Sequence, residues 1–293
     1  MELTHHSEYG LIKTIWLKHV THSFIDQDHI SMQWQKLNFI EEPDFETALK
    51  EYSQFEDVIR KTGAQIYYFD TDKTLPLDSI YCRDNSIATD WGAIICSMGK
   101  EDRMNETRSA EFKFTEQKQK VLGRIIPPGR LEGGDVCWLD KETLAVGHSY
   151  RTNIEGINQL RAYLEPKGIT VLKVDLPHYK GPGDVFHLMS ILSPVDKNLL
   201  VIYSPLMPVS FRNNLKDMGY EFIEVPDHEF ESMACNVLAI APRQCIMLKG
   251  NPVTQSKLEE AGARVNAFDG NEISFKGGGG PTCLTRPMLR RKC

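Results

Sequence analysis

The chain has 293 residues, of which 41% are hydrophobic and 25% charged, and its formal net charge is −6 at pH 7. This composition is typical of a globular protein that can bury a large core without disulfide or metal cross-links. The acidic balance argues against a general binder of nucleic acid or anionic membranes, which needs a basic excess. No apolar run reaches the ~18 residues of a membrane span, and the first 20 residues lack the order of a secretion signal, so we expect a cytoplasmic location.

In chain order, the predicted elements repeat as strand, strand, helix, strand. Two less regular units come first, with a strand at 15–20, a helix at 45–62 and a strand at 65–69, then strands at 87–89, 91–96 and 124–126 with a helix at 115–123. Three clearer units follow, with strands at 136–139, 143–146 and 170–174 and a helix at 153–164; strands at 188–192, 199–203 and 221–225 and a helix at 208–218; and strands at 237–241, 244–248 and 264–267 and a helix at 254–260. The polar run 100–108 is predicted to be irregular.

Five such units would have roughly 60 residues each, a period typical of closed radial arrays. The alternation of apolar strands with helices favours an α/β fold over a β-sandwich. We therefore predict one α/β domain spanning residues 1–293. A chance alignment of ordinary strand–helix segments is the alternative.

Residues with useful chemistry recur where each unit begins. They are Asp84, Glu132, His187 and Cys283. With Asn236 as the start of the unit between the last two, successive unit starts are separated by 47 to 55 residues. In a radial array the first strand of each unit lies nearest the axis, so these positions should converge on one small space. Their side chains would bring together a thiol, an imidazole and two carboxylates.

These groups make chemical sense together. A thiol becomes a good nucleophile when it is ionised, which a nearby imidazolium favours. A histidine can donate and accept protons in the two halves of a covalent mechanism. Two carboxylates suit a planar cation with several N–H donors, of which guanidinium is the obvious example.

Each motif alone also has a simpler interpretation. Arg83-Asp84 could form a surface ion pair, residues 132–135 a polar loop, and His187 a structural histidine. The glycine run 277–280 before Cys283 indicates either tightly packed backbone or a flexible tail. The remaining cysteines form no CxxC pair and look like free thiols, with Cys96, Cys137 and Cys245 inside apolar strands.

Five segments resemble the guanidine-modifying enzymes, or penteins, a superfamily that includes arginine deiminase, dimethylarginine dimethylaminohydrolase and the arginine:glycine amidinotransferases. In the order that the family has them, they are LDSIYCRD at 77–84, LEGGDV at 131–136, VGHSYRTN at 146–153, HLMS at 187–190 and GGGGPTC at 277–283. The resemblance implies a five-bladed α/β propeller, which agrees with the repeat found above.

The resemblance also implies roles for the residues. Cys283 would attack the guanidinium carbon, and His187 would protonate the leaving amine and then activate water. Asp84 and Glu132 would be the carboxylates that bind the guanidinium. No metal or other cofactor is implied, because thiolate, imidazole and carboxylates already supply the nucleophile, the proton carrier and the orientation.

Other positions are expected to bind the rest of the substrate. The resemblance implies that Arg151 clamps the substrate α-carboxylate. Arg108, three residues before Glu111, is a second candidate for this clamp. Asp78 matches a position that touches substrate in the dimethylarginine enzymes.

Met189 departs from part of the family. In deiminases and amidinotransferases an Asp lies two residues after the catalytic His. Residues two apart on a strand share a face, so Met189 should point where His187 points, and the site loses an acceptor. A guanidinium has five N–H donors and its Nω,Nω-dimethyl form has three, so fewer acceptors fit a methylated guanidine or a neutral ureido group better than free arginine.

We therefore expect a cysteine hydrolase that cleaves the guanidino C–N bond of a small arginine-like substrate through a covalent thiouronium and releases citrulline. Dimethylarginine is the first choice of substrate and arginine the second. Citrulline, giving ornithine, is the third. An inactive, amino-acid-binding propeller is the non-enzyme alternative, which the Cys–His pair disfavours. The oligomeric state is left open, with a homodimer as one alternative.

Overall fold

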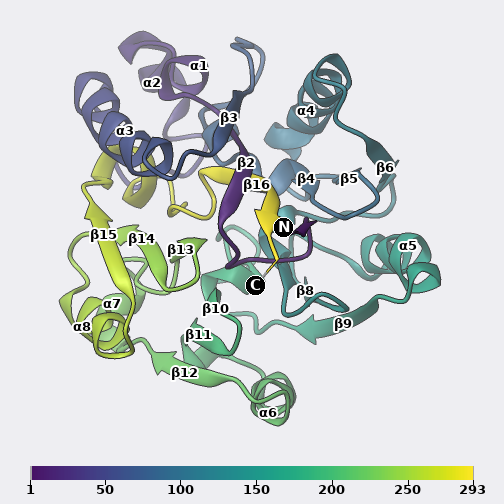
Figure 1. Ribbon diagram of the computed structural model, residues 1–293. Coiled ribbons are helices and arrows are strands. Elements are labelled where there is room, and N and C mark those ends of the chain that lie inside the picture. Colours follow the sequence, from purple (N-terminus) through teal and green to yellow (C-terminus); the bar gives the residue numbers. More distant parts are fainter. Residues whose placement is uncertain (1, 293) are drawn as a thin grey trace.

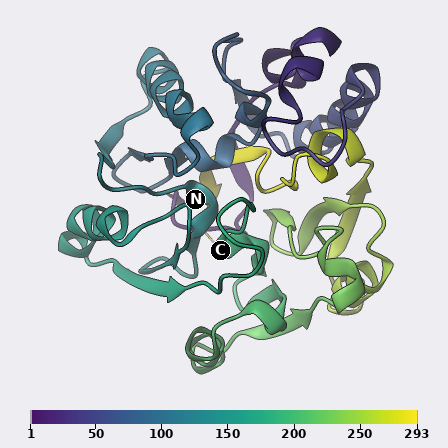
Figure 2. The same ribbon diagram turned by 180° about the vertical axis from the view of Figure 1, so that it is seen from behind.

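The computed structural model describes residues 2–292, and the strands among them form five separate small sheets. Figure 1 shows these sheets arranged around a common centre, with the longer helices on the outside. In the opposite view of Figure 2 the same five groups surround the centre, and the two marked chain ends lie near it. The predicted α/β class and the repeat are confirmed.

The unit that contains α5 shows the common pattern. Strand β7 (Val136–Trp138) pairs antiparallel with β8 (Thr143–His148), and β8 pairs parallel with β9 (Thr170–Asp175). The Asp140 carboxylate closes the hairpin by accepting two backbone N–H groups. A parallel pair needs a crossover, which α5 (Ile154–Leu164) provides.

Three further units repeat this order, each with one antiparallel and one parallel strand pair. They are β4 (Ser86–Ile87), β5 (Ala93–Ile95), α4 (Met104–Glu116) and β6 (Val121–Arg124); β10 (Leu192–Asp196), β11 (Leu199–Ile202), α6 (Val209–Asp217) and β12 (Glu221–Glu224); and β13 (Leu238–Ala241), β14 (Gln244–Leu248), α8 (Pro252–Glu260) and β15 (Arg264–Phe268).

The prediction was wrong for residues 100–123. The run 100–108 is not irregular, since it contains a 3₁₀ turn at Glu101–Arg103 and the start of α4. Residues 121–123, expected in a helix, belong to β6 (Val121–Arg124). The buried face of α4 consists of Glu106, Ala110 and Phe114, and the charged residue in the first of these positions obscured the apolar period.

The last sheet is completed by the end of the chain. Its strand order is β1 (Leu3–Thr4), β16 (Thr285–Arg291), β2 (Ile12–Leu17) and β3 (Gln65–Tyr68). Helix α3 (Phe45–Arg60) makes the parallel crossover from β2 to β3, after the short helices α1 (Val20–Ser23) and α2 (Gln27–Gln33). The first predicted unit lacked a second strand, and β16 supplies it by pairing antiparallel with β2.

Short 3₁₀ turns precede the first strand of three units. They span Cys82–Asn85, Gly133–Asp135 and Leu188–Ser190. Glu132 and His187 are the residues immediately before the second and third of these turns. The chain therefore brings equivalent positions together on turns rather than on the strands that were predicted.

None of the helices within residues 2–292 combines the length and apolar character needed to cross a bilayer.

Candidate active site

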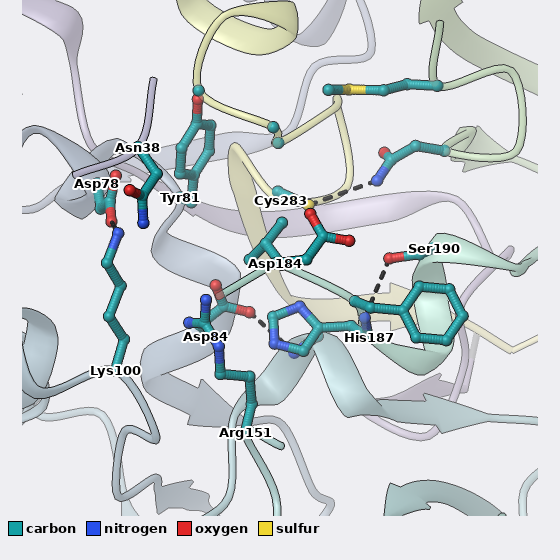
Figure 3. Close-up of a pocket in the computed structure, with 18 of the residues that line it drawn as sticks. Asn38, Asp78, Tyr81, Asp84, Lys100, Arg151, Asp184, His187, Ser190 and Cys283 are labelled. Atoms are coloured by element: carbon teal, nitrogen blue, oxygen red, sulfur yellow. Dashed lines mark hydrogen bonds and ion pairs between the residues drawn. The ribbon is translucent and has the colours of Figure 1, made fainter. Parts of the chain in front are cut away.

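A cavity of about 320 Å³ is lined by residues from the start of the units. Of the predicted site residues, it contains Asp78, Asp84, Arg151, His187, Met189 and Cys283. It also contains residues that sequence reasoning gave no role, among them Tyr81, Lys100, Arg103, Asp184 and Asn236. Figure 3 shows the side chains of the labelled residues around this space. The predicted convergence is therefore found, with two exceptions, Glu132 and Arg108.

The thiol of Cys283 is held at the cavity by Asn236. The Asn236 Nδ2 atom donates to Cys283 Sγ over 3.4 Å, while Oδ1 of the same side chain accepts from the Thr282 backbone N–H at 2.9 Å. The Arg83 N–H donates to the Cys283 carbonyl at 3.1 Å, which ties the thiol segment to the turn that carries Asp84. Equal spacing along the repeat marked Asn236 but did not reveal this contact.

The other cysteines that the structure describes do not line this cavity. Cys82, Cys96, Cys137, Cys235 and Cys245 are all buried, and burial raises the pKa of each thiol. Among the described cysteines, Cys283 is thus the one in a position to meet a ligand.

The glycine run before Cys283 is packed backbone, and the flexible-tail interpretation is wrong. A Cβ on Gly277 would lie 2.0 Å from Tyr81 Oη, and one on Gly279 would lie 2.4 Å from the Tyr81 ring. A Cβ on Gly280 would meet Asn236 at 2.5 Å. The absence of side chains lets the backbone close over Tyr81 and Asn236, and so fixes the approach to the thiol.

Glu132 is completely buried and is not part of the cavity lining. Its Oε1 atom accepts the backbone N–H groups of Gly99 at 2.8 Å and Lys100 at 3.1 Å. Its Oε2 atom lies 2.7 Å from His187 Nε2 and 3.6 Å from Arg151 Nη1. The two carboxylates that were predicted to bind a guanidinium together therefore differ in position. Asp84 lines the cavity, whereas Glu132 lies behind it and contacts the imidazole.

Asp84 lines the cavity directly. Its Oδ1 atom accepts the Gly134 N–H at 2.9 Å, and its Oδ2 atom lies 2.7 Å from Arg103 Nη1. One donor atom each from Asp84, Glu132 and His187 lies within 4.8 Å of the others. Such a group has the spacing to hold a divalent cation, and two carboxylates are also the groups that bind a guanidinium.

Charge explains the protonation of the imidazole and the thiol. Burial alone would lower the pKa of His187, but Asp135, Asp84 and the hydrogen bond to Glu132 outweigh it and raise that pKa to about 9. Burial, with the Asp84 charge, raises the pKa of Cys283. Burial opposes ionisation of Glu132, yet His187 and the arginines hold its pKa well below the usual range. At neutral pH these directions favour an imidazolium beside a carboxylate and a protonated thiol.

Asp135 belongs to the motif at 131–136 but was given no role. Its Oδ1 atom accepts the Leu188 N–H at 3.0 Å, and its Oδ2 atom accepts the Ser149 hydroxyl at 2.6 Å. The N–H of His187 donates to Ser190 Oγ at 3.1 Å. These bonds hold residues 188–190 in a 3₁₀ turn, so the strand argument for Met189 was wrong, although Met189 and His187 do line the same cavity.

The prediction that Arg108 is a second clamp for the substrate carboxylate was wrong. Arg108 is exposed on α4 and does not line the cavity, whereas Arg103 does. Arg103 is buried, binds the Glu106 carboxylate through Nε at 2.8 Å and Nη2 at 2.9 Å, and donates to the Tyr81 carbonyl at 3.0 Å. The spacing of Arg three residues before Glu occurs in both pairs, and burial separates them.

Replacing Arg103 and Arg108 separately by methionine should distinguish the two. Arg103→Met should reduce kcat/KM about a hundredfold or more, because it leaves the buried carboxylates Asp84 and Glu106 unpaired. Arg108→Met is the matched control and should stay within about twofold of wild type, as is usual for exposed side chains. Thermal melting of Arg103→Met and the milder Arg103→Lys separates lost folding from lost binding. Equal effects of the two methionine variants would contradict this assignment.

A thiol, an imidazole and a cavity-facing carboxylate, assembled on repeated α/β units, agree with a guanidine-modifying enzyme of the pentein type, and the comparisons place the chain among the members that hydrolyse linear amidines. A family model described as N,N dimethylarginine dimethylhydrolase, eukaryotic, matches residues 23–290. The chain belongs to this family.

Individual relatives agree with this placement. The N(G),N(G)-dimethylarginine dimethylaminohydrolase of Pseudomonas aeruginosa is 30% identical over 243 residues, which cover 83% of this chain and 89% of the relative. The arginine deiminase of Listeria welshimeri is 27% identical over 258 residues, 73% of this chain and 62% of the deiminase. A solved structure of the P. aeruginosa enzyme, a cysteine-to-serine mutant complexed with citrulline, superposes with a TM-score of 0.76 at 27% identity, over 94% of this chain and 98% of that one.

Proposed function

We propose that the protein is a cysteine hydrolase that cleaves the C–N bond between the guanidino carbon and the methylated nitrogen of Nω,Nω-dimethylarginine. The products would be citrulline and dimethylamine. The observation that carries the proposal is the shared cavity of Cys283, His187 and Asp84, with Glu132 bonded to the imidazole. A cytoplasmic location and a single domain remain predictions from the sequence.

Binding would bring a cation against the thiol. Asp84 would receive the guanidinium, and Arg151, whose buried Nη1 atom has no hydrogen-bond partner among the described residues, would receive the substrate carboxylate. Burial and Asp84 raise the pKa of Cys283, which keeps the thiol protonated when no substrate is bound. The positive charge of a bound guanidinium would act in the opposite direction and favour the thiolate. The thiol proton would be released to solvent, so the nucleophile would form chiefly when substrate is present.

The reaction would then proceed in two balanced halves. In the first, the Cys283 sulfur bonds to the guanidino carbon, and dimethylamine leaves with the proton that His187 carried, giving a thiouronium and a neutral imidazole. In the second, water adds to that carbon, one of its protons goes to His187 and the other to the departing thiol, and the C–S bond breaks. The oxygen of the water becomes the ureido oxygen of citrulline.

Product analysis tests this proposal. The protein is incubated separately with dimethylarginine, monomethylarginine, arginine and citrulline, and dimethylamine, methylamine, ammonia and ornithine are measured. We expect dimethylamine and citrulline from the first substrate at the highest kcat/KM. Ammonia from arginine at a higher rate would support the second candidate, a deiminase, which the 27% identity to arginine deiminase favours. No product from any of the four compounds would contradict both and support the non-enzyme alternative.

The substitution Met189→Asp tests the substrate preference. Met189 lines the cavity and is 3% exposed, so an aspartate there would add an acceptor near His187. We expect kcat/KM for arginine to rise relative to dimethylarginine, by about 1–3 kcal/mol in barrier difference. Protonation of a third carboxylate in this site would reduce the effect. The ratio of the two kcat/KM values is measured in wild type and variant, and a strong wild-type preference for arginine would contradict the role given to Met189.

A further inference from the structure

Lys100 and Asp78 form an ion pair within the cavity, on the side away from the thiol (Figure 3). Lys100 Nζ lies 2.5 Å from Asp78 Oδ2 and 3.0 Å from the Leu37 carbonyl oxygen. All three residues line the cavity, and the lysine side chain is 16% exposed. One charged and one neutral acceptor thus converge on a single ammonium group.

A carboxylate and a carbonyl placed in this way form an ammonium-binding site, whatever molecule the ammonium belongs to. An ammonium has three N–H donors and no acceptor, so both oxygens satisfy it well. The α-amine of an amino acid is the same chemical group as the end of a lysine side chain. Because Lys100 is tethered to the cavity wall, it competes for these acceptors at a high effective concentration.

The cavity also contains cationic groups that can meet a carboxylate. Arg103 and Arg151 line the same cavity as Lys100, and the buried Nη1 atom of Arg151 has no hydrogen-bond partner in the described chain. The nitrogens of Arg103 already bond Asp84, Glu106 and the Tyr81 carbonyl. Arg151 Nη1 makes no hydrogen bond, although Glu132 lies 3.6 Å away, so it is the donor that a carboxylate would find. An amine would find its carboxylate, Asp78, already paired with a lysine.

We propose that Lys100 is a specificity-determining residue that takes the place of the substrate's α-amine at Asp78 and Leu37. The inference rests on the proposed function and refines its substrate class: guanidino acids recognised through their carboxylate, with or without an α-amine. An α-amino substrate must displace Lys100 from Asp78, which offsets what its amine gains. A substrate without the amine leaves this ion pair intact.

The side chain of Lys100 can be changed while the residue keeps its hydrogen bond to Glu132, the carboxylate beside the His187 ring. The bond from Lys100 to Glu132 Oε1 comes from the backbone N–H, so Lys100→Met retains it. Lys180→Met is the matched control, because Lys180 also lines the cavity but pairs with Glu231 at 2.7 Å. Lys100→Ala is the second variant in case the methionine variant does not fold.

The experiment compares dimethylarginine with its desamino analogue, 5-(N′,N′-dimethylguanidino)pentanoate, as substrates for wild type and the variants. In wild type we expect kcat/KM values for the two compounds within about threefold of each other. In Lys100→Met we expect the ratio of amino to desamino substrate to rise about tenfold or more, because the amine gains a free carboxylate. The ratio should not change in Lys180→Met.

A rise of less than about threefold in Lys100→Met, or an equal rise in Lys180→Met, would overturn the proposal. If neither compound is turned over, the proposed hydrolysis fails, and calorimetric binding of the same two compounds to the same variants then gives the ratio instead. An unchanged binding ratio, or no binding, would overturn the role of Lys100 as well.

Discussion

Replacing Cys283 by serine should lower kcat by roughly a thousandfold or more, while the variant still binds substrate, since a hydroxyl at neutral pH is a far weaker nucleophile than a thiolate. Asn236 and the packed glycine run hold the backbone and the Sγ atom in place, and a serine fits the same position. Steady-state turnover of dimethylarginine and calorimetric binding of citrulline measure the two properties separately.

The control is Cys245→Ser, which changes a buried cysteine outside the cavity and should keep its turnover. In wild type, a reaction quenched with acid should show added mass on the peptide that contains Cys283. An active Cys283→Ser protein would rule out the covalent mechanism, even though the fold and the family would stand.

The imidazole gives the second large effect. His187→Gln should abolish measurable turnover, because both proposed proton transfers use this ring. Glu132→Gln should keep the acceptor for the two backbone N–H groups but remove the charge that helps to raise the pKa of His187. We therefore expect the loss of kcat at high pH, near pH 9 in wild type, to move to lower pH in this variant.

Profiles of kcat from pH 6 to about 10 measure that shift. Asp135→Asn tests a second of the carboxylates that raise the pKa of His187, and it should move the profile in the same direction. Coincident profiles for wild type and Glu132→Gln would mean that this carboxylate does not set the protonation of the ring.

The same pair makes folding stability depend on pH. The folded-state pKa of His187 is raised from 6.5 to about 9, so its contribution is complete below about pH 6.5 and is lost as the pH rises through 9. The pKa of Glu132 is lowered, so its contribution is present above the ordinary carboxylate range and is lost on acidification. We therefore expect the melting temperature of wild type to be higher between the ordinary carboxylate range and about pH 6.5 than at pH 9 to 10. This difference should be smaller in Glu132→Gln.

The sequence pattern predicted most of the repeat, because β7 to β15 follow a regular alternation of apolar strands and amphipathic helices. It failed where tertiary contacts override local pattern. Helix α4 buries the charged Glu106 against Arg103, which no hydrophobic period reveals. Strand β16 joins a sheet begun more than 250 residues earlier, through pairs such as Thr285 with Leu17. Such pairing depends on contacts between residues far apart in the sequence, which a local pattern does not contain.

For the site, sequence reasoning selected Cys283, His187 and Asp84, which do share one cavity. It could not distinguish a residue that faces the cavity from one that lies behind it. The depth of Glu132 depends on the 3₁₀ turn that follows it. The choice between Arg103 and Arg108 depends on which side of α4 and of the turn before it faces the centre. Residues 100–108, which contain both arginines, had been predicted to be irregular.

The pairing of β16 with β2 also has a consequence for how the protein is made. Cys283 lies two residues before β16, so the thiol is translated after Asp84, Glu132 and His187. Its segment can be fixed only when β16 adds to a sheet whose other strands left the ribosome much earlier. A partly synthesised chain, or one cut before residue 283, thus carries the substrate-facing carboxylate and the imidazole but no nucleophile. The nucleophile is thus added to a pocket whose other described lining residues have already been translated.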